Sequence, residues 1–437
     1  KGNLCRCTGY QNIVRAVQAL ASNALDDHDE FSGGEGIGAP VPRVEDQRFL
    51  TGRGVYCADI NLPGQLHAVF ARSNVPHANI VEVATSKAEA LPGVVAVLTG
   101  SDLDSETIGE LRCEWSVNSR NGEPMKGGAR SILARDRVRF VGDAYAVVIA
   151  ETEAAARRAL KLIEPHFEPL THNVRPDGAM TGASLFHEAA DNICFDWLFG
   201  DEDGADRAIA EAAHTTTINL TNNRLIPNAL EPRAAIADYR SASNRATLYT
   251  TSQNPHMARK VIAQTMGFIG EHNLRVISPD LGGGFGSKIF IYPEECVCLW
   301  ASRRLGRPIK WVGTREESFL ADAHGRDHQA VATLALNEAH EFVALKVENT
   351  ANLGAYLSSF AAFVPTYLYG TMLAGPYKTE TISCAVKGVF TNTAPVDAYR
   401  GAGRPEATYL IETLIDACAR DLSIDPVELR RRYLIQP

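Results

Sequence analysis

The sequence predicts an α+β protein built from more than one unit. A short helical pattern occupies residues 12–22, and strand-like apolar runs then mix with an alanine-rich helical stretch over residues 45–170. Beyond residue 210, long β-rich stretches are interleaved with helices. The chain has 437 residues, which is long enough for two or three domains. We therefore expect a small helical unit followed by larger units of mixed helix and sheet.

The composition is that of a globular protein, with 45% hydrophobic and 22% charged residues. A net charge of −9 without a basic stripe argues against a nucleic-acid partner. The most apolar runs, such as residues 144–150, are much shorter than the roughly 20 residues that span a bilayer, so we expect no membrane span. The nine scattered cysteines lack the dense spacing of a secreted disulfide framework, and we expect a cytoplasmic protein.

Two cysteines, Cys5 and Cys7, stand one residue apart just before the first helical pattern. Irregular backbone at such a junction lets both sulfurs face one metal centre, as in an iron–sulfur cluster. A two-iron cluster needs four ligands, usually thiolates, so this pair supplies half of a set. A pair of unligated thiols is the alternative. Cys296 and Cys298 lie in a helical pattern, where residues two apart diverge by about 200°, and we expect them in the core.

Shifts in composition divide the chain into four segments. Residues 1–24 end with the short helix, and residues 25–44 form an acidic, glycine-rich linker with too little apolar surface to pack. Residues 45–170 form the first mixed unit, and residues 171–437 form the β-rich unit. Two helices of the last unit are bounded by a proline at the start and a glycine at the end, Pro255 to Gly267 and Pro293 to Gly306.

A glycine-rich stretch, LGGGFGSK at residues 281–288, follows the strand-like run 273–278. Ser287 stands where both a Walker phosphate loop and a dinucleotide fingerprint starting at Gly282 need glycine, so neither nucleotide motif is complete. Two interpretations remain open. The stretch is either a tight structural turn or a cradle of backbone N–H groups for an oxyanion or a cofactor.

A second loop, AYRGAGR at residues 398–404, places Arg400 and Arg404 around small residues just before a helix that begins near Pro405. Guanidinium groups and the backbone amides of a helix start both suit an anionic ligand. A salt-bridged turn is the alternative. The loop therefore predicts an anion site or a structural turn.

Other catalytic patterns are incomplete. His187 and Glu188 begin like the HExxH zinc motif, but Asp191 stands in place of the second histidine. His324 and His328 have the spacing of one helix face, yet the alternation that follows them predicts a strand and structural histidines. The sequence has no GxSxG elbow, so serine hydrolase chemistry has no support.

These motifs, in this order, resemble the molybdenum hydroxylases, a family that includes xanthine dehydrogenase, aldehyde oxidase and aerobic carbon monoxide dehydrogenase. NLCRCTGYQNI resembles the end of their iron–sulfur subunit, which implies that Cys5 and Cys7 ligate a 2Fe–2S cluster. Residues 36–73 resemble the start of the large subunit and lead into its α/β hammerhead domain. The resemblance thus implies a fusion, natural or made by gene joining. Its parts are a 2Fe–2S remnant at 1–24, a linker at 25–44, a hammerhead domain at 45–170 and the first part of a molybdopterin-binding domain at 171–437.

The resemblance also implies roles for individual residues. TSQNPH resembles the segment whose glutamine hydrogen-bonds an oxo ligand of molybdenum, which is Gln253 here. GGGFG resembles the loop that holds the apical ligand and the dithiolene end of the pterin, and AYRGAGR resembles the active-site loop beneath the metal. Gln253 and Arg400 are the implied catalytic residues. The implied contacts to the cofactor, a molybdopterin cytosine dinucleotide, come from Gly283, Gly284, Phe285, Gly286, Ala398, Tyr399, Arg400 and Gly401.

Two departures from close relatives bear on the substrate. Copper-dependent carbon monoxide enzymes carry a cysteine after the loop arginine, and this chain has Gly401, as in the so-called form II subunits. Xanthine enzymes carry an acidic residue after the lysine of the glycine-rich loop, and this chain has Ile289. The expected substrate is an aldehyde, an N-heterocycle or carbon monoxide. The general-base glutamate of the family lies beyond the position matching Pro437, so we expect no turnover by this chain alone.

The resemblance implies partners as well. Electrons would pass to 2Fe–2S clusters, and FAD would lie on another subunit. The chain would assemble with iron–sulfur and flavin subunits into a protomer, and two such protomers would form a dimer. A different class of function stays open: a non-catalytic scaffold or assembly subunit with the hammerhead fold, in which the glycine-rich loops are only turns.

Overall fold

The computed structural model describes residues 14, 17–18, 21, 39 and 41–436. The chain divides into two compact units, Lys1–Gly54 and Val55–Pro437. In the first unit, α2 (Asp46–Leu50) begins beside Arg43, whose guanidinium pairs with Asp46 at 2.7 Å. The predicted cluster ligands Cys5 and Cys7, and nearly all of the predicted linker, lie outside the described residues.

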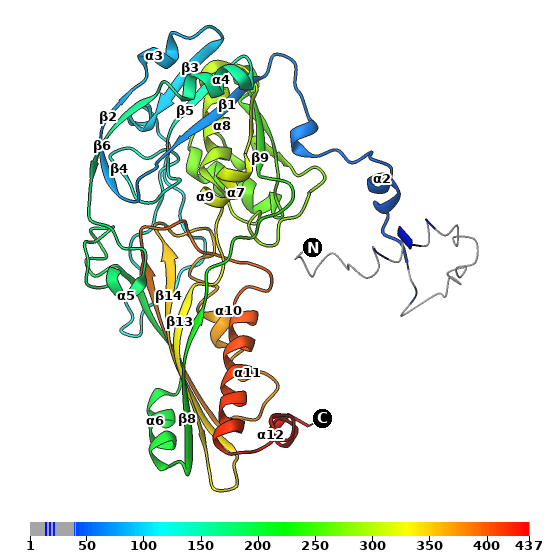
Figure 1. The fold of residues 1–437 in the computed structure, drawn as a ribbon. Coiled ribbons are helices and arrows are strands. Elements are labelled where there is room, and N and C mark those ends of the chain that lie inside the picture. Colours follow the sequence, from blue (N-terminus) through cyan, green and yellow to red (C-terminus); the bar gives the residue numbers. More distant parts are fainter. Residues whose placement is uncertain (1–13, 15–16, 19–20, 22–38, 40, 437) are drawn as a thin grey trace. The chain divides into compact units, whose positions relative to one another are not determined.

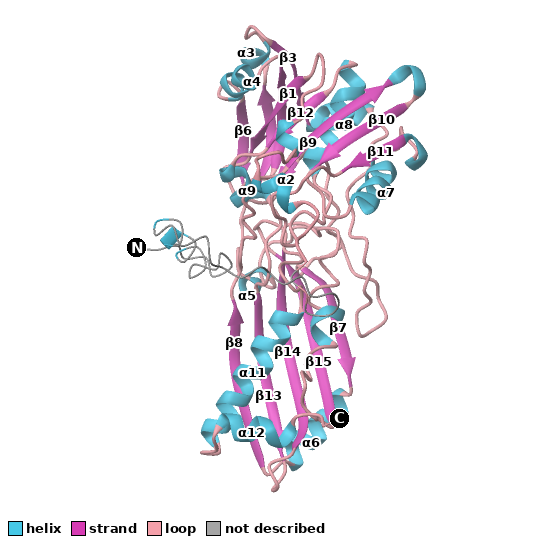
Figure 2. Cartoon of the chain, turned by 90° about the vertical axis from the view of Figure 1, so that its right-hand side faces the viewer, coloured by secondary structure: helices cyan, strands magenta, loops and turns pink. Residues whose placement is uncertain are grey.

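The second unit contains two large sheets and one small sheet (Figure 1). The seven-stranded sheet has the order β11-β10-β9-β12-β1-β5-β3, the five-stranded sheet β7-β15-β14-β13-β8, and the small sheet β4-β2-β6. Figure 2 shows the two large sheets with long loops between them. The strands are β1 (Leu66–Arg72), β2 (Ala78–Ala84), β3 (Val94–Thr99), β4 (Arg137–Val138), β5 (Ala144–Ala150), β6 (Glu164–Pro169), β7 (Ile193–Gly200), β8 (His214–Asn222), β9 (Ala234–Arg240), β10 (Arg245–Thr250), β11 (Leu274–Ile277), β12 (Ile309–Val312), β13 (His328–Leu336), β14 (Phe342–Gly354) and β15 (Thr381–Phe390).

The helices cover the faces and ends of these sheets. They are α3 (Ser86–Glu89), α4 (Glu153–Leu160), α5 (Pro176–Ala179), α6 (Glu202–Glu211), α7 (Pro255–Met266), α8 (Pro293–Leu305), α9 (Arg315–Ala321), α10 (Tyr367–Gly370), α11 (Arg404–Asp421) and α12 (Pro426–Tyr433). No helix in the described part of the chain is both long and apolar enough to cross a bilayer. The predicted α+β class is confirmed.

The apolar run at 144–150 becomes β5, in which every residue is buried. It lies antiparallel between β1 and β3. Val147 and Ile149 pack into the core that contains α8, while Val148 and Ala150 pack into the core that contains α4. A strand covered on both faces needs apolar residues at every position, which explains why this run lacks the alternation of a half-exposed strand.

The seven-stranded sheet joins segments that are distant in the sequence. β1 pairs in parallel with β12, with Leu66 opposite Ile309. β12 in turn pairs with β9, and β9 with β10. Strands from both sides of residue 170 therefore form one continuous sheet.

Both helices with predicted boundaries form as expected. α7 begins at Pro255 and ends before Gly267, which has φ +65°, and α8 runs from Pro293 to Leu305 before Gly306, with φ +66°. The left-handed conformation at each end is the one that glycine adopts most readily. α8 is buried on nearly all sides, and Cys296 and Cys298 are both completely buried, so their predicted place in the core is confirmed.

The five-stranded sheet is built on long strands. β14 and β15 run in parallel, while β13 pairs antiparallel with β14 and β8. α11 packs against β8 and β13, and its residues Leu410 and Leu414 join the largest core cluster. α6 lies on the other side of the strands from α11 (Figure 1). The loop between β15 and α11, at residues 398–404, is the part of the candidate site that this sheet carries.

Candidate cofactor site

Three loops meet where the two large sheets face each other (Figure 2). One follows β10 and contains Gln253, and the second, residues 282–288, follows β11 and is called the glycine loop below. The third, residues 398–404, lies between β15 and α11 and is called the arginine loop. Loops at strand ends and helix starts expose backbone N–H groups that no regular element uses, so they commonly build ligand sites.

Gln253 is held against the glycine loop at both its backbone and its side chain. Its backbone N–H donates to the carbonyl of Lys288 at 2.7 Å, and its Oε1 accepts from the N–H of Gly286 at 3.0 Å. A Cβ at Gly284 would lie 2.3 Å from the same Oε1, so only glycine leaves room for the amide there. Gly286 already engages the acceptor Oε1. The side chain therefore offers a ligand its Nε2 group, a donor of the type that binds an oxo oxygen.

The glycine loop has the backbone shape of an anion cradle. Gly283, Phe285 and Gly286 have φ of +91°, +54° and +109°. Positive φ at a phenylalanine is uncommon and marks a backbone held by its surroundings. Within residues 41–436, the N–H groups of Gly283, Gly284 and Phe285 have no hydrogen-bond acceptor. Successive free amides in such a turn form a concave site for negatively charged or oxygen-bearing ligands.

The arginine loop lies directly against the glycine loop. The N–H of Arg400 donates to the carbonyl of Phe285 at 2.9 Å, and the Arg400 guanidinium lies 5.1 Å from the centroid of the Phe285 ring. A Cβ at Gly286 would lie 2.3 Å from the carbonyl oxygen of Ala398, which shows how closely the two backbones approach. Contacts among the predicted stretches 253, 283–286 and 398–401 thus form one continuous site, while Cys5 and Cys7 lie outside the described residues.

Arg326 is a residue of this site that the sequence analysis missed. Its Nη1 donates to the carbonyl of Tyr399 at 2.6 Å and its Nη2 to the carbonyl of Arg400 at 3.0 Å. Glu406, at the start of α11, pairs with the same guanidinium at 3.0 Å. The buried arginine therefore fixes the backbone of the arginine loop. In the sequence, the HGRDH motif is notable for the spacing of its histidines, and nothing near Arg326 points to a loop 73 residues away.

Glu231 was also missed, and it closes the glycine loop at both ends. Its Oε2 accepts from the N–H of Gly282 and from Nζ of Lys288, each at 2.8 Å. Burial lowers the pKa of Lys288, and the contact with Glu231 opposes that shift. The lysine that suggested a phosphate loop thus serves here to hold the loop closed.

Asp397 precedes the arginine loop and is fully buried. Its Oδ1 accepts from the N–H of Ala398 at 2.7 Å, and its Oδ2 accepts from the N–H of Phe360 at 2.8 Å. Burial raises the pKa of Asp397 to about 7. Its charge state therefore changes near neutral pH at the root of the arginine loop.

The two histidines of HGRDH are buried and hydrogen-bonded, and His328 begins β13, so the predicted strand is confirmed. Nδ1 of His324 lies 3.1 Å from Nη1 of Arg224, and Nδ1 of His328 lies 3.2 Å from Nδ2 of Asn349. Burial lowers the pKa of His324 to about 4 and that of His328 to about 3. Both are neutral at pH 7 and serve as structural groups.

The donor set fits a molybdenum–pterin group. Such a group presents oxo oxygens, sulfurs and a phosphate, and the site offers three free backbone N–H groups, the Gln253 amide and the Arg400 cation. The glycines remove the Cβ atoms that would fill the cradle. The geometry is thus suited to holding an electron-rich ligand between the glycine loop and the arginine loop.

Two family models match most of the chain. The family model "Aldehyde oxidase and xanthine dehydrogenase, a/b hammerhead domain" matches residues 51–171, and the model "Molybdopterin cofactor-binding domain" matches residues 185–434. The large subunit of nicotine 6-hydroxylase from Paenarthrobacter nicotinovorans is 33% identical over 413 residues, which cover 92% of this chain and 48% of that subunit.

Two solved structures share the fold over most of this chain. A reconstituted CO dehydrogenase from Oligotropha carboxidovorans has a TM-score of 0.84 and 33% identity, covering 92% of this chain and 50% of its own. Quinoline 2-oxidoreductase from Pseudomonas putida 86 has a TM-score of 0.82 and 32% identity, covering 91% and 50%. This chain spans about half the length of these relatives. On these matches, the chain belongs to the molybdenum hydroxylase family of aldehyde oxidase, xanthine dehydrogenase and CO dehydrogenase.

Proposed function

We propose that this protein forms the molybdenum-binding part of a hydroxylase that oxidises an N-heterocycle or an aldehyde. The observation that carries the proposal is the meeting of Gln253, the free amides of the glycine loop and Arg400 in one site. The bound group, proposed as the cytosine dinucleotide form of molybdopterin, would supply two-electron oxidation with oxygen taken from water.

Each part of the site has a distinct task in this proposal. Nε2 of Gln253 donates to an oxygen of the bound group, because Oε1 is already engaged by Gly286. The N–H groups of Gly283, Gly284 and Phe285 hold its other polar atoms. Arg400 supplies positive charge next to the same region, and Arg326 keeps that loop in place through two backbone carbonyls.

We propose a substrate other than carbon monoxide, because Gly401 has no thiolate side chain that could bind Cu(I). Gly401 has φ +99°, and a Cβ there would lie 2.7 Å from Cγ of Pro405. A cysteine at this position would therefore be strained and crowded, and it is the thiolate that a Cu(I) site requires. Of the three reported relatives, two are named for nicotine and quinoline, both nitrogen heterocycles, and the third is named for CO. The first two support an N-heterocycle as the proposed substrate class.

The proposal extends to the electron path. Cys5 and Cys7 would supply two ligands of a 2Fe–2S cluster, and FAD would lie on a separate flavin subunit. Two relatives are named as a large chain of a dehydrogenase and as a subunit of a dehydrogenase complex, which supports further subunits as partners. Iron–sulfur and flavin subunits are the partners that we propose. A cytoplasmic location and a dimer of protomers remain part of the proposal.

The direct test measures molybdenum and pterin in the purified protein and in two variants. Gly284→Ala places a Cβ 2.3 Å from Oε1 of Gln253, and Gln253→Ala removes the amide, so both should lower cofactor content. Loss of one anchoring hydrogen bond corresponds to about tenfold in affinity. Gly109→Ala is the matched control, because its Cβ would meet only the carbonyl of Thr265 at 3.5 Å.

A scaffold protein would give a different result. Its glycine loop would be a turn, so Gln253→Ala would leave every measured property near that of the parent protein. Absence of molybdenum and pterin from a folded parent protein would overturn the proposed function.

A further inference from the structure

Tyr292 connects the glycine loop to a segment that begins at Ala323 and contacts the arginine loop. It precedes α8, and its hydroxyl donates to the carbonyl of Ser287 at 2.6 Å. The same hydroxyl accepts from the N–H of Ala323 at 3.1 Å. One oxygen atom thus bridges the backbones of two segments that no strand pairing joins.

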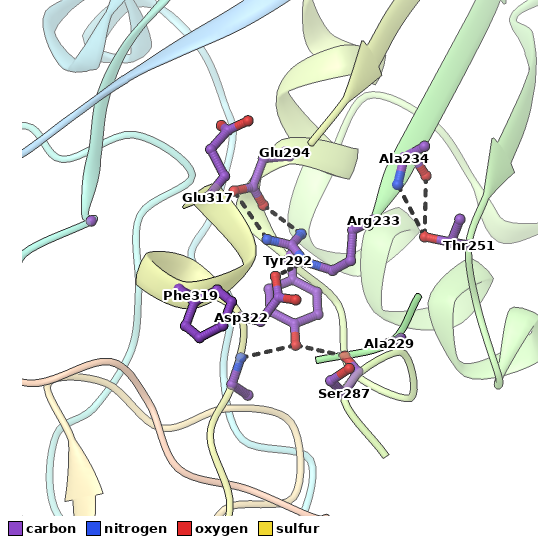
Figure 3. Close-up of polar contacts among 12 residues, drawn as sticks. Ala229, Arg233, Ala234, Thr251, Ser287, Tyr292, Glu294, Glu317, Phe319 and Asp322 are labelled. Atoms are coloured by element: carbon purple, nitrogen blue, oxygen red, sulfur yellow. Dashed lines mark hydrogen bonds and ion pairs between the residues drawn. The ribbon is translucent and has the colours of Figure 1, made fainter. Parts of the chain in front are cut away.

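The ring of Tyr292 is held in place by a buried charge cluster. The Arg233 guanidinium lies 3.7 Å from its centroid, and that guanidinium pairs with Glu294 at 2.9 Å and Asp322 at 2.6 Å (Figure 3). Arg72 pairs with the same Glu294 at 2.7 Å. A cation over an aromatic face in a desolvated site is a strong contact, so the ring has little freedom to turn.

The segment that begins at Ala323 reaches the arginine loop within a few residues. The N–H of His324 donates to the carbonyl of Pro395, and the N–H of Asp397 donates to the carbonyl of His324. Arg326 then binds the carbonyls of Tyr399 and Arg400. A shift of Ala323 would therefore be passed to the arginine loop through hydrogen bonds of one short segment.

We propose that Tyr292 is a positioning residue that sets the separation between the glycine loop and the arginine loop. The role rests on the proposed function, because the two loops form the two sides of the cofactor cradle. No atom of Tyr292 needs to touch the cofactor. Its hydroxyl acts through Ser287 on one side and through Ala323 on the other.

The test substitution is Tyr292→Phe, which removes the hydroxyl and keeps the ring against Arg233. The Ser287 carbonyl and the Ala323 N–H then lose their partner in a buried site. An unpaired buried group has a cost that corresponds to about ten- to hundredfold in a local opening equilibrium. Amide hydrogen exchange at Gly286, Ser287 and Arg400 should therefore accelerate by about that factor.

The matched control is Tyr377→Phe. Tyr377 is 4% exposed against 5% for Tyr292, and its hydroxyl also donates one hydrogen bond, to Glu412 at 2.8 Å. Its partner Glu412 lies within α11, eight residues past Arg404 at the end of the arginine loop. This variant should leave exchange at Gly286 and Arg400 unchanged, so a general loss of stability can be separated from a local one.

A second measurement needs no substitution. If the Tyr292 hydroxyl joins the two segments, the amides of Ala323 and Arg400 in the parent protein should open together and show the same opening equilibrium. Opening of Ala323 more than tenfold more often than Arg400 would overturn the proposal. Unchanged exchange in both loops of Tyr292→Phe, or global unfolding of that variant, would overturn it as well.

The cofactor readout separates this proposal from the proposed function. In a molybdenum-loaded parent enzyme, Tyr292→Phe should release the cofactor about tenfold faster and shift the Mo(V) paramagnetic resonance spectrum, while Tyr377→Phe should do neither. Coupled exchange in a parent protein that binds no molybdenum would support the positioning role and reject the function. Molybdenum binding by the parent protein, with exchange and cofactor release unaltered in Tyr292→Phe, would support the proposed function and reject the positioning role.

Discussion

Replacing Gly286 with alanine perturbs the closest approach between the two loops of the site. The new Cβ would lie 2.3 Å from the carbonyl oxygen of Ala398 and 3.2 Å from Cα of Tyr399, both backbone atoms that cannot rotate away. Gly286 also has φ +109°, where a side chain is strained by about 1–2 kcal/mol. To relieve the contact, the loops must separate, which breaks the Arg400 N–H to Phe285 carbonyl hydrogen bond of 2.9 Å and costs about 1 kcal/mol more.

The expected loss in the free energy of unfolding is thus about 2–3 kcal/mol for Gly286→Ala. Gly306→Ala is the control, because Gly306 has φ +66° but no atom within 4 Å of its added Cβ, so about 1 kcal/mol is expected. Urea unfolding followed by tryptophan fluorescence measures both, at an unchanged slope. If the two variants lose equal stability, the close approach of the loops does not hold.

Three further predictions concern charges around the site. Burial raises the pKa of Asp397 to about 7, so between pH 4 and pH 7 the folded state holds a proton that the unfolded state releases. The contribution of Asp397 to the free energy of unfolding therefore falls by up to about 4 kcal/mol as pH rises through this range. Asp397→Asn should remove that slope when urea midpoints are compared at pH 5 and pH 8. His324 and His328 act in the opposite direction, because burial lowers their pKa values to about 4 and about 3. They favour folding above about pH 6.5, and this contribution is lost as pH falls. A His324→Asn, His328→Gln double variant should therefore flatten the acid side of the curve of unfolding free energy against pH. Arg326→Lys keeps the charge but loses the forked contact with two carbonyls, so hydrogen exchange across residues 398–401 should rise by about tenfold or more. Arg157→Lys is the control, because the half-exposed Arg157 pairs with Glu153 on its own helix, and it should leave that exchange unchanged.

Local patterns in the sequence were sufficient for many elements of the fold. Proline and glycine at the ends of α7 and α8 act within one turn, and the apolar run of β5 reflects burial on both faces. The sheet order was not accessible in this way. β1 pairs with β12, which lies more than 200 residues later, and no local periodicity states which strand another strand will join. β9 was not anticipated either, because AAIADYR is short, alanine-rich and low in the β-branched residues that indicate strands.

The site shows the same division between local and distant information. Gln253 and the two loops are visible because glycines and arginines cluster in short stretches, and the structure places these stretches in contact. Glu231 and Arg326 escaped notice because each acts on a loop far from it in the sequence, through a side chain whose target is a backbone atom. Nearly every residue has a backbone carbonyl and a backbone N–H, so the sequence does not indicate which of these groups a side chain will bind. Side chains with such targets are recognised only in the folded structure.

The buried charges beneath the site are better explained by positioning than by stability. Lys288 with Glu231, Arg326 with Glu406, and the Arg233 cluster each remove full charges from water, and such pairs are often no more stabilising than apolar residues of the same size. What these pairs share is a contact, direct or through Tyr292, with the backbone of a site loop. Forked and charge-assisted hydrogen bonds have stricter geometry than apolar packing, so they hold each loop at one distance rather than over a range. A cradle of backbone amides needs that restriction, because its donors cannot turn toward a ligand as side chains can.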